Sequence, residues 1–498
     1  MLAEIIKVGL LFLTYLVSST SLVVIFFQIS RCAREQALSF FYICLSVGPV
    51  FLSFVLSILL VILPNQTAQF YLAVTLLILF CPFVFFPTQF KLLSATIKYL
   101  IKEFAEILCQ FNLTSMVFYF FIAVIFLLFL NALIFPLTGN DSLEYAQVGR
   151  ILFNEHNLSI YPVLDSSSTR GFYAPWSHPP AYVVLHFWGF LIQGSADYAG
   201  VIRFTAPYFL VATALTLAHF AGSIRSYAGC MAALVYVSTP MVFWGGLDGS
   251  VDPLRIATFF SAILAIYIFR HRDKWELSVL VLLLVFALYS HSINILILPI
   301  FLALFPLLRS GSWKSRLSYV AVIACISVLL TPSYFKNIYL FGNVVSDMPD
   351  LWALDHLQYK EYFAIERGID GIARKIVNGV LKGWSNLQLF GITYWLFLIS
   401  TIAWLLGKYK QFGKEIKKLH SRSYTLDLSL MSFTLLIVIG FYSGVILSVL
   451  LGLDILIKNA RYLLVAQPFI SLFIGIFLSR LAGVGRPFST IIEKKRAI

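Results

Sequence analysis

The stretch 115-SMVFYFFIAVIFLLFLNALIFPL-137 is almost wholly apolar, and 139-GNDSLEYAQVGRILFNEH-156 follows it with two acids, Asp141 and Glu144. An apolar run of about 20 residues can cross the ~30 Å hydrocarbon core of a bilayer as a helix. Runs of this kind recur along all 498 residues, of which 60% are hydrophobic and only 12% are charged. Soluble domains carry about twice that share of charge, so the sequence predicts an all-α polytopic membrane protein.

The cysteines and the first apolar run give two further predictions, about disulfide or zinc sites and about the N-terminal span. The six Cys lie in or beside apolar runs and form no Cys-x-x-Cys pair, so the sequence indicates neither a disulfide framework nor a zinc site. No small-residue cleavage site follows the first apolar run, and we therefore expect that run to be retained as a span.

The apolar runs predict thirteen spans. They lie near residues 5–29, 38–63, 68–89, 115–137, 201–221, 229–247, 254–269, 276–290, 292–308, 317–333, 388–407, 426–452 and 462–479. The eighth is short for a bilayer, but the basic segments 270-RHRDK-274 and 309-RSGSWKSR-316 flank the region that contains it. These two segments share a side only if the chain turns back between them, at 290-SHSIN-294.

Charged residues divide unequally between the two sides of this layout. One side holds 23 Lys and Arg against 8 Asp and Glu, in the loops 30–37, 90–113, 222–228, 270–276, 309–316 and 408–427 and the tail from 480. The rest of the chain holds 13 basic and 15 acidic residues. The basic side is expected to be cytoplasmic, which places the N-terminus outside and the C-terminus inside. The net charge of +13 then reflects membrane orientation, and nucleic-acid binding is not expected.

We divide the chain into three accessory N-terminal spans with a cytoplasmic linker (1–113), a core (114–480) and a basic cytoplasmic tail (481–498). The core carries two long outer segments, 138–200 and 334–387. Loops of such length between packed spans are usually functional or disordered. The first predicts two short helices, 142–156 and an interfacial helix at 179–193 that begins with Pro-Pro.

Polar and ionisable residues gather on the outer side of this layout. They are Asp141, Glu144, His178, Asp248, Asp252, His291, Lys336, Asn337, Asn343 and Arg461. Because this gathering played no part in drawing the spans, it indicates a site at the outer membrane boundary.

Asp141 and Glu144 have two explanations. Asp-x-x-Glu ahead of a helix is a variant of the capping box, with Asp141 as N-cap and Glu144 at the third helical position. A functional site would instead need an acid at the membrane interface whose pKa is set by its neighbours. The two roles are compatible, since a cap holds an acid in place.

The other polar segments also have structural explanations. His178 lies in the aromatic turn 173-YAPWSHPPAY-182, and Asp248 and Asp252 lie in the turn sequence 245-GGLDGSVDPLR-255. Arg461 and Tyr462 begin the last span as an interfacial anchor would, although Arg also suits bidentate binding of phosphate.

Taken in order, these segments resemble the GT-C superfamily of membrane glycosyltransferases, most closely its protein-mannosyltransferase-like and aminoarabinose-transferase-like branch. The likeness covers roughly residues 115–480 and rests on 141-DSLEY-145, 178-HPP-180, 248-DGSVDP-253, 332-PSYFKNIYLFGN-343 and 461-RYLL-464. The chain departs from the family pattern in the three spans that precede the acidic loop and in the separation of its two acids. Lys336 stands where the family usually has Arg.

The resemblance implies a polyprenyl-phosphate sugar as donor, used on the outer face with inversion at the anomeric carbon. Asp141 would act as general base for an acceptor hydroxyl on a glycan, lipid or protein. Glu144 would orient the acceptor or complete the cap. No cofactor is certain: a divalent cation between acids and phosphate stays open, and no His/Asp cluster has metal-ligand spacing.

The resemblance also implies roles for the remaining site residues. Binding of the donor phosphate would fall to Arg461, Lys336 and His178. Further contacts with substrate would come from Tyr145, Asp248, Asp252 and Tyr462.

Two other classes fit parts of the sequence. A transporter or flippase of lipid-linked sugars would place ionisable residues near the midplane and show internal repeats, whereas here the acids gather at one face. An outer-face oligosaccharide ligase or polymerase would rely on the later outer segment, for example on His356. We expect a bacterial or archaeal plasma membrane, with an endoplasmic-reticulum membrane as the alternative.

Overall fold

The computed structural model describes residues 2–109, 112–158, 161, 178–270, 276–309, 312–341, 373, 381, 385–419, 429–450 and 460–483. Within this part of the chain the regular structure is helical and there is no strand. The all-α prediction is thus confirmed. Asn343, His356 and the basic tail from 484, all named in the sequence predictions, lie outside the described residues.

Seven helical segments are long and apolar enough to cross a membrane, which makes the chain an integral multi-pass membrane protein. They are α1 (Leu2–Ile29), α3 (Ala37–Ile62), α4 (Ala68–Phe85), α6 (Leu113–Ile134), η2 with α9 (Val201–Gly222), α12 (Asp252–Phe269) and a last segment, Leu463–Ala482, which ends in α24 (Gln467–Ala482). An eighth is added if α10 (Ser226–Val237) and α11 (Pro240–Leu247), bent by 67° at Ser238–Thr239, form one span.

The other predicted spans also coincide with helices. These are α13 (Leu277–Ser290), η4 (Ser292–Leu296) with α14 (Ile297–Leu308), α15 (Trp313–Leu329), α22 (Thr393–Leu419) and α23 (Leu430–Leu450). Their described apolar parts are shorter than 18 residues, so the total of thirteen spans stays a prediction.

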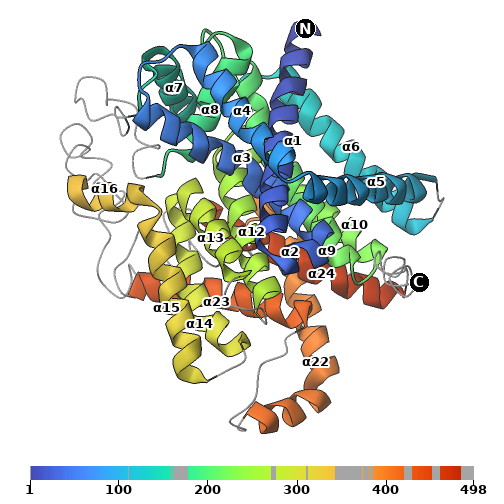
Figure 1. The fold of residues 1–498 in the computed structure, drawn as a ribbon. Helices are drawn as coiled ribbons and strands as arrows, with labels where there is room; N and C mark the ends of the chain where they lie inside the picture. The colour runs from blue at the N-terminus through green and yellow to red at the C-terminus, as the bar shows by residue number, and fades with distance from the viewer. Residues whose placement is uncertain are drawn as a thin grey trace.

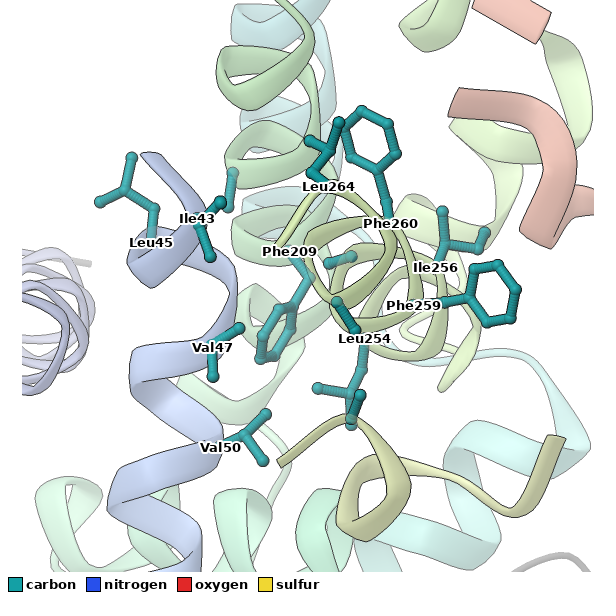
Figure 2. Close-up of a cluster of buried hydrophobic side chains, with 14 of the residues drawn as sticks. Ile43, Leu45, Val47, Val50, Phe209, Leu254, Ile256, Phe259, Phe260 and Leu264 are labelled. Atoms are coloured by element: carbon teal, nitrogen blue, oxygen red, sulfur yellow. The ribbon is translucent and has the colours of Figure 1, made fainter. Parts of the chain in front are cut away.

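Helix α12 is the centre of the bundle (Figure 1). All of its residues except Tyr267 are buried. It packs against α3, α9, α13 and α14, and Figure 2 shows Phe209 of α9 between Val47 of α3 and Leu254 of α12. Because protein surrounds α12 on all sides, polar groups in its first turn can be held away from lipid.

Small residues allow other helices to approach closely, as is common between membrane helices. A Cβ on Gly48 of α3 would overlap Ser19 of α1. A Cβ on Gly475 of α24 would come within 2.7 Å of the Ala232 methyl of α10. Replacing either glycine would force the two helices of its pair apart.

The N-terminal spans belong to the same hydrophobic core. Helix α3 packs against α8 (Ala181–Gln193) as well as α9, α12 and α13, and α5 (Pro87–Cys109) joins α4 to α6. The boundary that we drew at residue 113 therefore does not coincide with a gap in the packing. An accessory role of these helices in function remains a prediction.

Two helices cover one end of the bundle, α7 (Asn140–Glu155) and α8, at the upper left of Figure 1. Every residue of α8 except Ile192 is buried, because α7 lies on one side and α1 and α3 on the other. Burial all round differs from the half-exposed interfacial helix that the sequence predicts. Helix α7 covers the face of α8 that would otherwise lie in the membrane interface. The local sequence of α8 gives no sign of this contact.

Loops that the span layout assigns to one side meet at one end of the bundle. At the basic end, the backbone N–H of Cys32 donates to Glu276 Oε1 at 2.8 Å, and Arg225 Nη1 donates to the Ser479 carbonyl at 2.9 Å. At the other end, the Asn65 N–H donates to the His156 carbonyl at 3.0 Å. Each of these contacts joins segments that the predicted layout places on the same side, and the full alternation of thirteen spans stays a prediction.

Candidate functional site

Three segments that are far apart in the sequence meet where α7 begins. Arg461, in the 3-10 helix η7 (Ala460–Ala466), lies between Asp141 of α7 and Asp252 of the first turn of α12. Its Nε lies 3.0 Å from Asp252 Oδ2, and its Nη2 donates to Asp141 Oδ2. One guanidinium group is thus shared by two carboxylates.

Asp252 also binds a second arginine. Arg255 Nη2 lies 2.9 Å from Asp252 Oδ1, and both side chains are almost fully buried, with 1% and 2% of their surfaces exposed. Arg255 Nη2 also donates to the backbone carbonyl of Arg461 at 3.2 Å. Because a buried charge is stable only when it is paired, Asp252 and Arg255 need each other. Together they position Arg461, Asp252 through its side chain and Arg255 through its backbone carbonyl.

The capping-box prediction for Asp141 is wrong. Helix α7 begins at Asn140 with Gly139 as its N-cap, and no side chain caps it. Asp141 lies in the first turn, where the helix dipole favours a negative charge, and its carboxylate is bound by Arg461 instead of by the helix backbone. Glu144 lies one turn later and is half-buried.

Asp248 fixes the chain just ahead of α7. Thr138 Oγ1 donates to Asp248 Oδ1 at 3.2 Å, and a Cβ on Gly139 would overlap the same carboxylate. Burial raises the pKa of Asp248, and so does the nearby charge of Asp141, whereas the hydrogen bonds from Thr138 and the Gly139 backbone lower it. A glycine at 139 is what allows the two segments to approach.

Two histidines stack beside this cluster. The rings of His178 and His291 lie 3.9 Å apart at an angle of 29°, and His178 Nδ1 is 2.5 Å from Ser292 Oγ. The Ile293 N–H donates to His291 Nδ1 at 3.1 Å. Burial, followed by the charges of His178 and the two arginines, lowers the pKa of His291 well below its usual value, so His291 is neutral at pH 7.

A buried amide places His291. Asn294 Nδ2 donates to Ser290 Oγ at 2.8 Å, to Thr258 Oγ1 at 3.0 Å and to the Ala287 carbonyl at 3.0 Å. Thr258 belongs to α12, so this amide ties the turn between α13 and η4 to the helix that carries Asp252 and Arg255.

Tyr145 lies one turn after Asp141 on α7. Its ring makes an edge contact with Tyr182, at 5.2 Å between centroids, and lies nearly parallel to His178 at 6.4 Å. Burial raises the pKa of Tyr145 well above its usual value, so its hydroxyl stays protonated. This buried hydroxyl has no hydrogen-bond partner in the part of the chain that the structure describes, which leaves a donor beside Asp141.

Lys336 joins the cluster through Tyr161. It lies on α16 (Pro332–Phe341), and its Nζ donates to the Tyr161 carbonyl. The Tyr161 hydroxyl in turn donates to the His178 carbonyl at 2.6 Å. Tyr462 lies in η7 next to Arg461, and its side chain, like that of Asn337, is outside the described residues.

No three His, Cys, Asp or Glu side chains are grouped to hold a metal ion in the described ranges. Asp141 and Asp252 are each bound to Arg461, so a protein cation already neutralises the acids that a divalent ion would need. The described residues therefore do not fit a metal ion between Asp141 and Asp252.

The sequence predictions missed Arg255 and gave no role to His291, Tyr161 or Tyr182. Arg255 could have been found, because Asp-x-x-Arg places both side chains on one helix face and a charged residue inside an apolar span is unusual. Tyr182 donates its hydroxyl to the Gly249 carbonyl at 2.7 Å. No sequence pattern signals that contact, which depends on how α8 meets the turn before α12.

Comparisons of the chain with protein-family models, with curated proteins and with solved structures give no match. The functional assignment therefore rests on the residues and contacts described above.

Proposed function

We propose that this protein is a membrane glycosyltransferase of the GT-C type that transfers a sugar from a polyprenyl-phosphate donor to an acceptor hydroxyl. The observation that carries the proposal is the contact between Asp141 and Arg461, two residues 320 positions apart. An acid and a fixed cation at one end of a membrane bundle are what a displacement at a lipid-linked phosphate requires. The two side chains are 18% and 25% exposed, so a substrate can reach them.

The pairing suggests the order of events. In the resting protein, Arg461 neutralises Asp141. The donor phosphate binds Arg461 and takes the place of the Asp141 carboxylate, which is then free to act as a base. Asp141 accepts the proton of the acceptor hydroxyl while the hydroxyl oxygen bonds to the anomeric carbon. The bond between that carbon and the phosphate oxygen breaks, and its electron pair leaves with the phosphate, which inverts the anomeric configuration.

Arg461 stabilises the charge that develops on the leaving phosphate, because a fixed cation needs no reorganisation during the reaction. Lys336 and His178 assist from the side of Tyr161, through which they are connected. Tyr145 supplies a protonated hydroxyl next to the base for a sugar or acceptor oxygen.

Asp252 has a different role from the substrate contact that the family likeness implies. Both of its oxygens are engaged by arginines, and it is buried. We assign Asp252 and Arg255 as positioning residues, since they act on the donor only through Arg461. Asp248 likewise acts by holding the segment before α7 in place.

The membrane arrangement is part of the same proposal. We propose thirteen spans, with the end that carries Asp141 facing outward and the basic end facing the cytoplasm. Nucleotide sugars are absent from the outer face, which accords with a lipid-linked donor. The sugar-accepting molecule would then be a glycan, lipid or protein of the cell envelope, and the enzyme would serve glycan biosynthesis in a bacterial or archaeal plasma membrane.

The direct experiment follows a labelled sugar from a panel of polyprenyl-phosphate donors in proteoliposomes that contain the full chain and extracted envelope acceptors. Asp141→Asn keeps the size of the side chain and removes the base. Turnover should fall by about 10²–10⁴-fold, the usual contribution of a general base. Asp197→Asn is the matched control, because Asp197 is exposed beyond α8 and takes no part in the site. Transfer by Asp141→Asn at the wild-type rate would exclude Asp141 as the base.

Arg461 is tested by its effect on the donor. Arg461→Lys retains the charge but loses the planar fork that binds phosphate, so KM for the donor should rise more than kcat falls. If both parameters stay at wild-type values, the donor phosphate binds elsewhere. If the unchanged protein releases no sugar from any donor but carries lipid-linked sugar across the liposome membrane, the protein is a flippase.

A further inference from the structure

His291 lies in the turn between α13 and η4, beside the ion pairs of the candidate site. Its side chain is only 2% exposed, and the charges of Arg255 and Arg461 both lower the pKa of its ring. The reaction proposed above gives His291 no part. A histidine that is buried next to two arginines therefore needs its own explanation.

One ring nitrogen of His291 fixes which tautomer is present. His291 is the N-cap of η4, and its Nδ1 accepts a hydrogen bond from the Ile293 N–H at 3.1 Å. A ring nitrogen that accepts a hydrogen bond carries no proton, so the single proton of the neutral ring lies on Nε2. Protonation of Nδ1 would set an N–H against the Ile293 N–H. The cap and the burial of the ring thus favour the same neutral form.

The other ring nitrogen, Nε2, is open to a ligand. Among the residues that the structure describes, no carbonyl or side chain accepts a hydrogen bond from His291 Nε2. Nε2 is not one of the buried polar atoms that lack a partner, so part of its surface is accessible. His291 therefore offers an N–H donor to a molecule bound at the site.

The ring of His291 is held in place by its neighbours. It stacks on His178, with the two centroids 3.9 Å apart. The buried Asn294 amide donates to Thr258 Oγ1 of α12 at 3.0 Å and so ties the turn to the central helix. The stack, the cap and this amide orient the Nε2–H before a ligand arrives. A donor oriented in advance needs no reorganisation as charge develops on its acceptor.

The charges of the site explain why a neutral donor suits this position. Asp141 and Asp252 are balanced by two arginines. A donor phosphate that takes Arg461 leaves Asp141 without its cation, which is the state in which Asp141 acts as a base. An imidazolium at His291 would attract the Asp141 carboxylate and make it a weaker base. A neutral N–H donor binds the phosphate without adding a charge.

We propose that His291, as a neutral imidazole, donates its Nε2–H to an oxygen of the phosphate that links the sugar to the polyprenyl carrier. The inference rests on the proposed function, because it adds a contact to the same site. The proton stays on Nε2 throughout, since the imidazolate that would remain is far too basic to form. The hydrogen bond strengthens as negative charge grows on the leaving phosphate.

Two substitutions separate the cap from the donor. His291→Asn places an amide oxygen where Nδ1 accepts the Ile293 N–H, and Asn is a strongly favoured N-cap. Its side chain is too short to place a donor where Nε2 lies. His291→Gln loses the cap and extends an amide N–H toward the position of Nε2. If His291 served only as a cap, His291→Asn would be the better tolerated of the two.

Binding is measured without sugar transfer. The thermal unfolding midpoint of the full chain in a neutral detergent is followed while undecaprenyl phosphate is titrated in, since a ligand that binds only the folded protein raises the midpoint. Undecaprenol, which lacks the phosphate, should raise it less. His291→Asn should need about 10–100-fold more undecaprenyl phosphate for the same rise, the usual effect of losing a hydrogen bond to a charged group. His291→Gln should lie between His291→Asn and the wild type.

His219→Asn is the matched control. It removes another buried imidazole, whose Nε2 is 3.0 Å from Ser39 Oγ at the basic end of the bundle, and should bind undecaprenyl phosphate as the wild type does. An equal loss in His219→Asn would assign the effect to general loosening of the bundle and overturn the inference.

The nitrogen chemical shifts of His291 in the wild type give a second measurement that needs no variant. Nε2 should be the protonated nitrogen, and its signal should move when undecaprenyl phosphate is added. A proton on Nδ1, or a signal that does not move, would contradict the proposed contact.

The outcomes distinguish this inference from the proposed function. Wild-type binding by His291→Asn would overturn the phosphate contact and leave the transferase proposal intact. Weaker binding by His291→Asn, in a protein that transfers no sugar from any donor, would support the contact and reject the transferase. An equal response of the wild type to undecaprenyl phosphate and undecaprenol would mean that the phosphate is not bound, and the inference would fail.

Discussion

The candidate site holds two ion pairs, Asp252 with Arg255 and Asp141 with Arg461, which are linked because Arg461 also contacts Asp252. The two pairs differ in burial. Asp252 and Arg255 are 2% and 1% exposed, whereas Asp141 and Arg461 are 18% and 25% exposed. In a pair that water cannot reach, removing one charge leaves the other buried without solvation. The outer pair is partly exposed, so a ligand can reach it and replace one of the partners. The inner pair is therefore structural, and the outer pair is where a substrate can act.

The largest effect should come from breaking the inner pair. Arg255→Met leaves the buried Asp252 with one arginine and should lower the free energy of unfolding by about 3–5 kcal/mol. Arg461→Met removes the cation of Asp141 and one of the two arginines of Asp252, which stays paired with the fully buried Arg255. It should therefore cost less, about 1–3 kcal/mol. Thermal and chemical unfolding of the two variants in the same detergent measures the difference.

Equal destabilisation by Arg255→Met and Arg461→Met would mean that both pairs are structural, and the exchange of Asp141 for phosphate would then lose its basis. The double variant Asp252→Asn with Arg255→Met sharpens the comparison. Because it removes both buried charges, it should recover much of the stability that Arg255→Met loses.

A smaller loss of stability is expected at Gly139, where the segment that leads into α7 contacts Asp248. Gly139→Ala places a Cβ against the Asp248 carboxylate and should destabilise the protein by about 1–3 kcal/mol, as overpacking usually does. It should also lower turnover, because α7 and Asp141 must shift. Gly9→Ala is the matched control, since nothing lies within 4 Å of a Cβ there. If Gly139→Ala is as stable and as active as Gly9→Ala, the approach of Asp248 to α7 does not position the site.

The smallest effect concerns pH. The pKa of His291 is well below its usual value in the folded protein because the ring is buried near His178 and the two arginines. The unfolded chain binds a proton below pH ~6.5 that the folded protein does not, so stability should fall there by up to about 1.4 kcal/mol per pH unit. Above that pH both states are neutral and His291 contributes no slope.

His291→Gln isolates this contribution. Unfolding midpoints of the wild type and His291→Gln are compared between pH 8 and pH 5, and the difference between the two slopes is the contribution of His291. The variant should lose less stability on acidification than the wild type. The same slope in both proteins would show that His291 is charged or exposed in the folded state.

The helices and the division of the chain between two ends follow from local patterns. In a membrane, apolar runs such as 115–137 satisfy their backbone hydrogen bonds by forming helices. Each span then places the next loop on the opposite side of the membrane. That is why Asp141, Asp252 and Arg461 could be placed at one end from charge and parity. The identity of α8 as a buried helix could not be predicted, because its sequence is apolar on all faces in either environment.

The pairings inside the site came only from the tertiary structure. In the sequence, the residues around Asp141 have the pattern of a helix cap. Nothing near Asp141 indicates that its partner is Arg461, 320 residues away. Asp252 resembles an exposed turn residue until α12 is seen to lie at the centre of the bundle. The sequence by itself determined the class of the protein and the end where its charges lie, because these depend on hydrophobicity and alternation along the chain. The packing of α7, α12 and η7 decided which acid is buried and which can be released, because burial depends on neighbours that are distant in the chain.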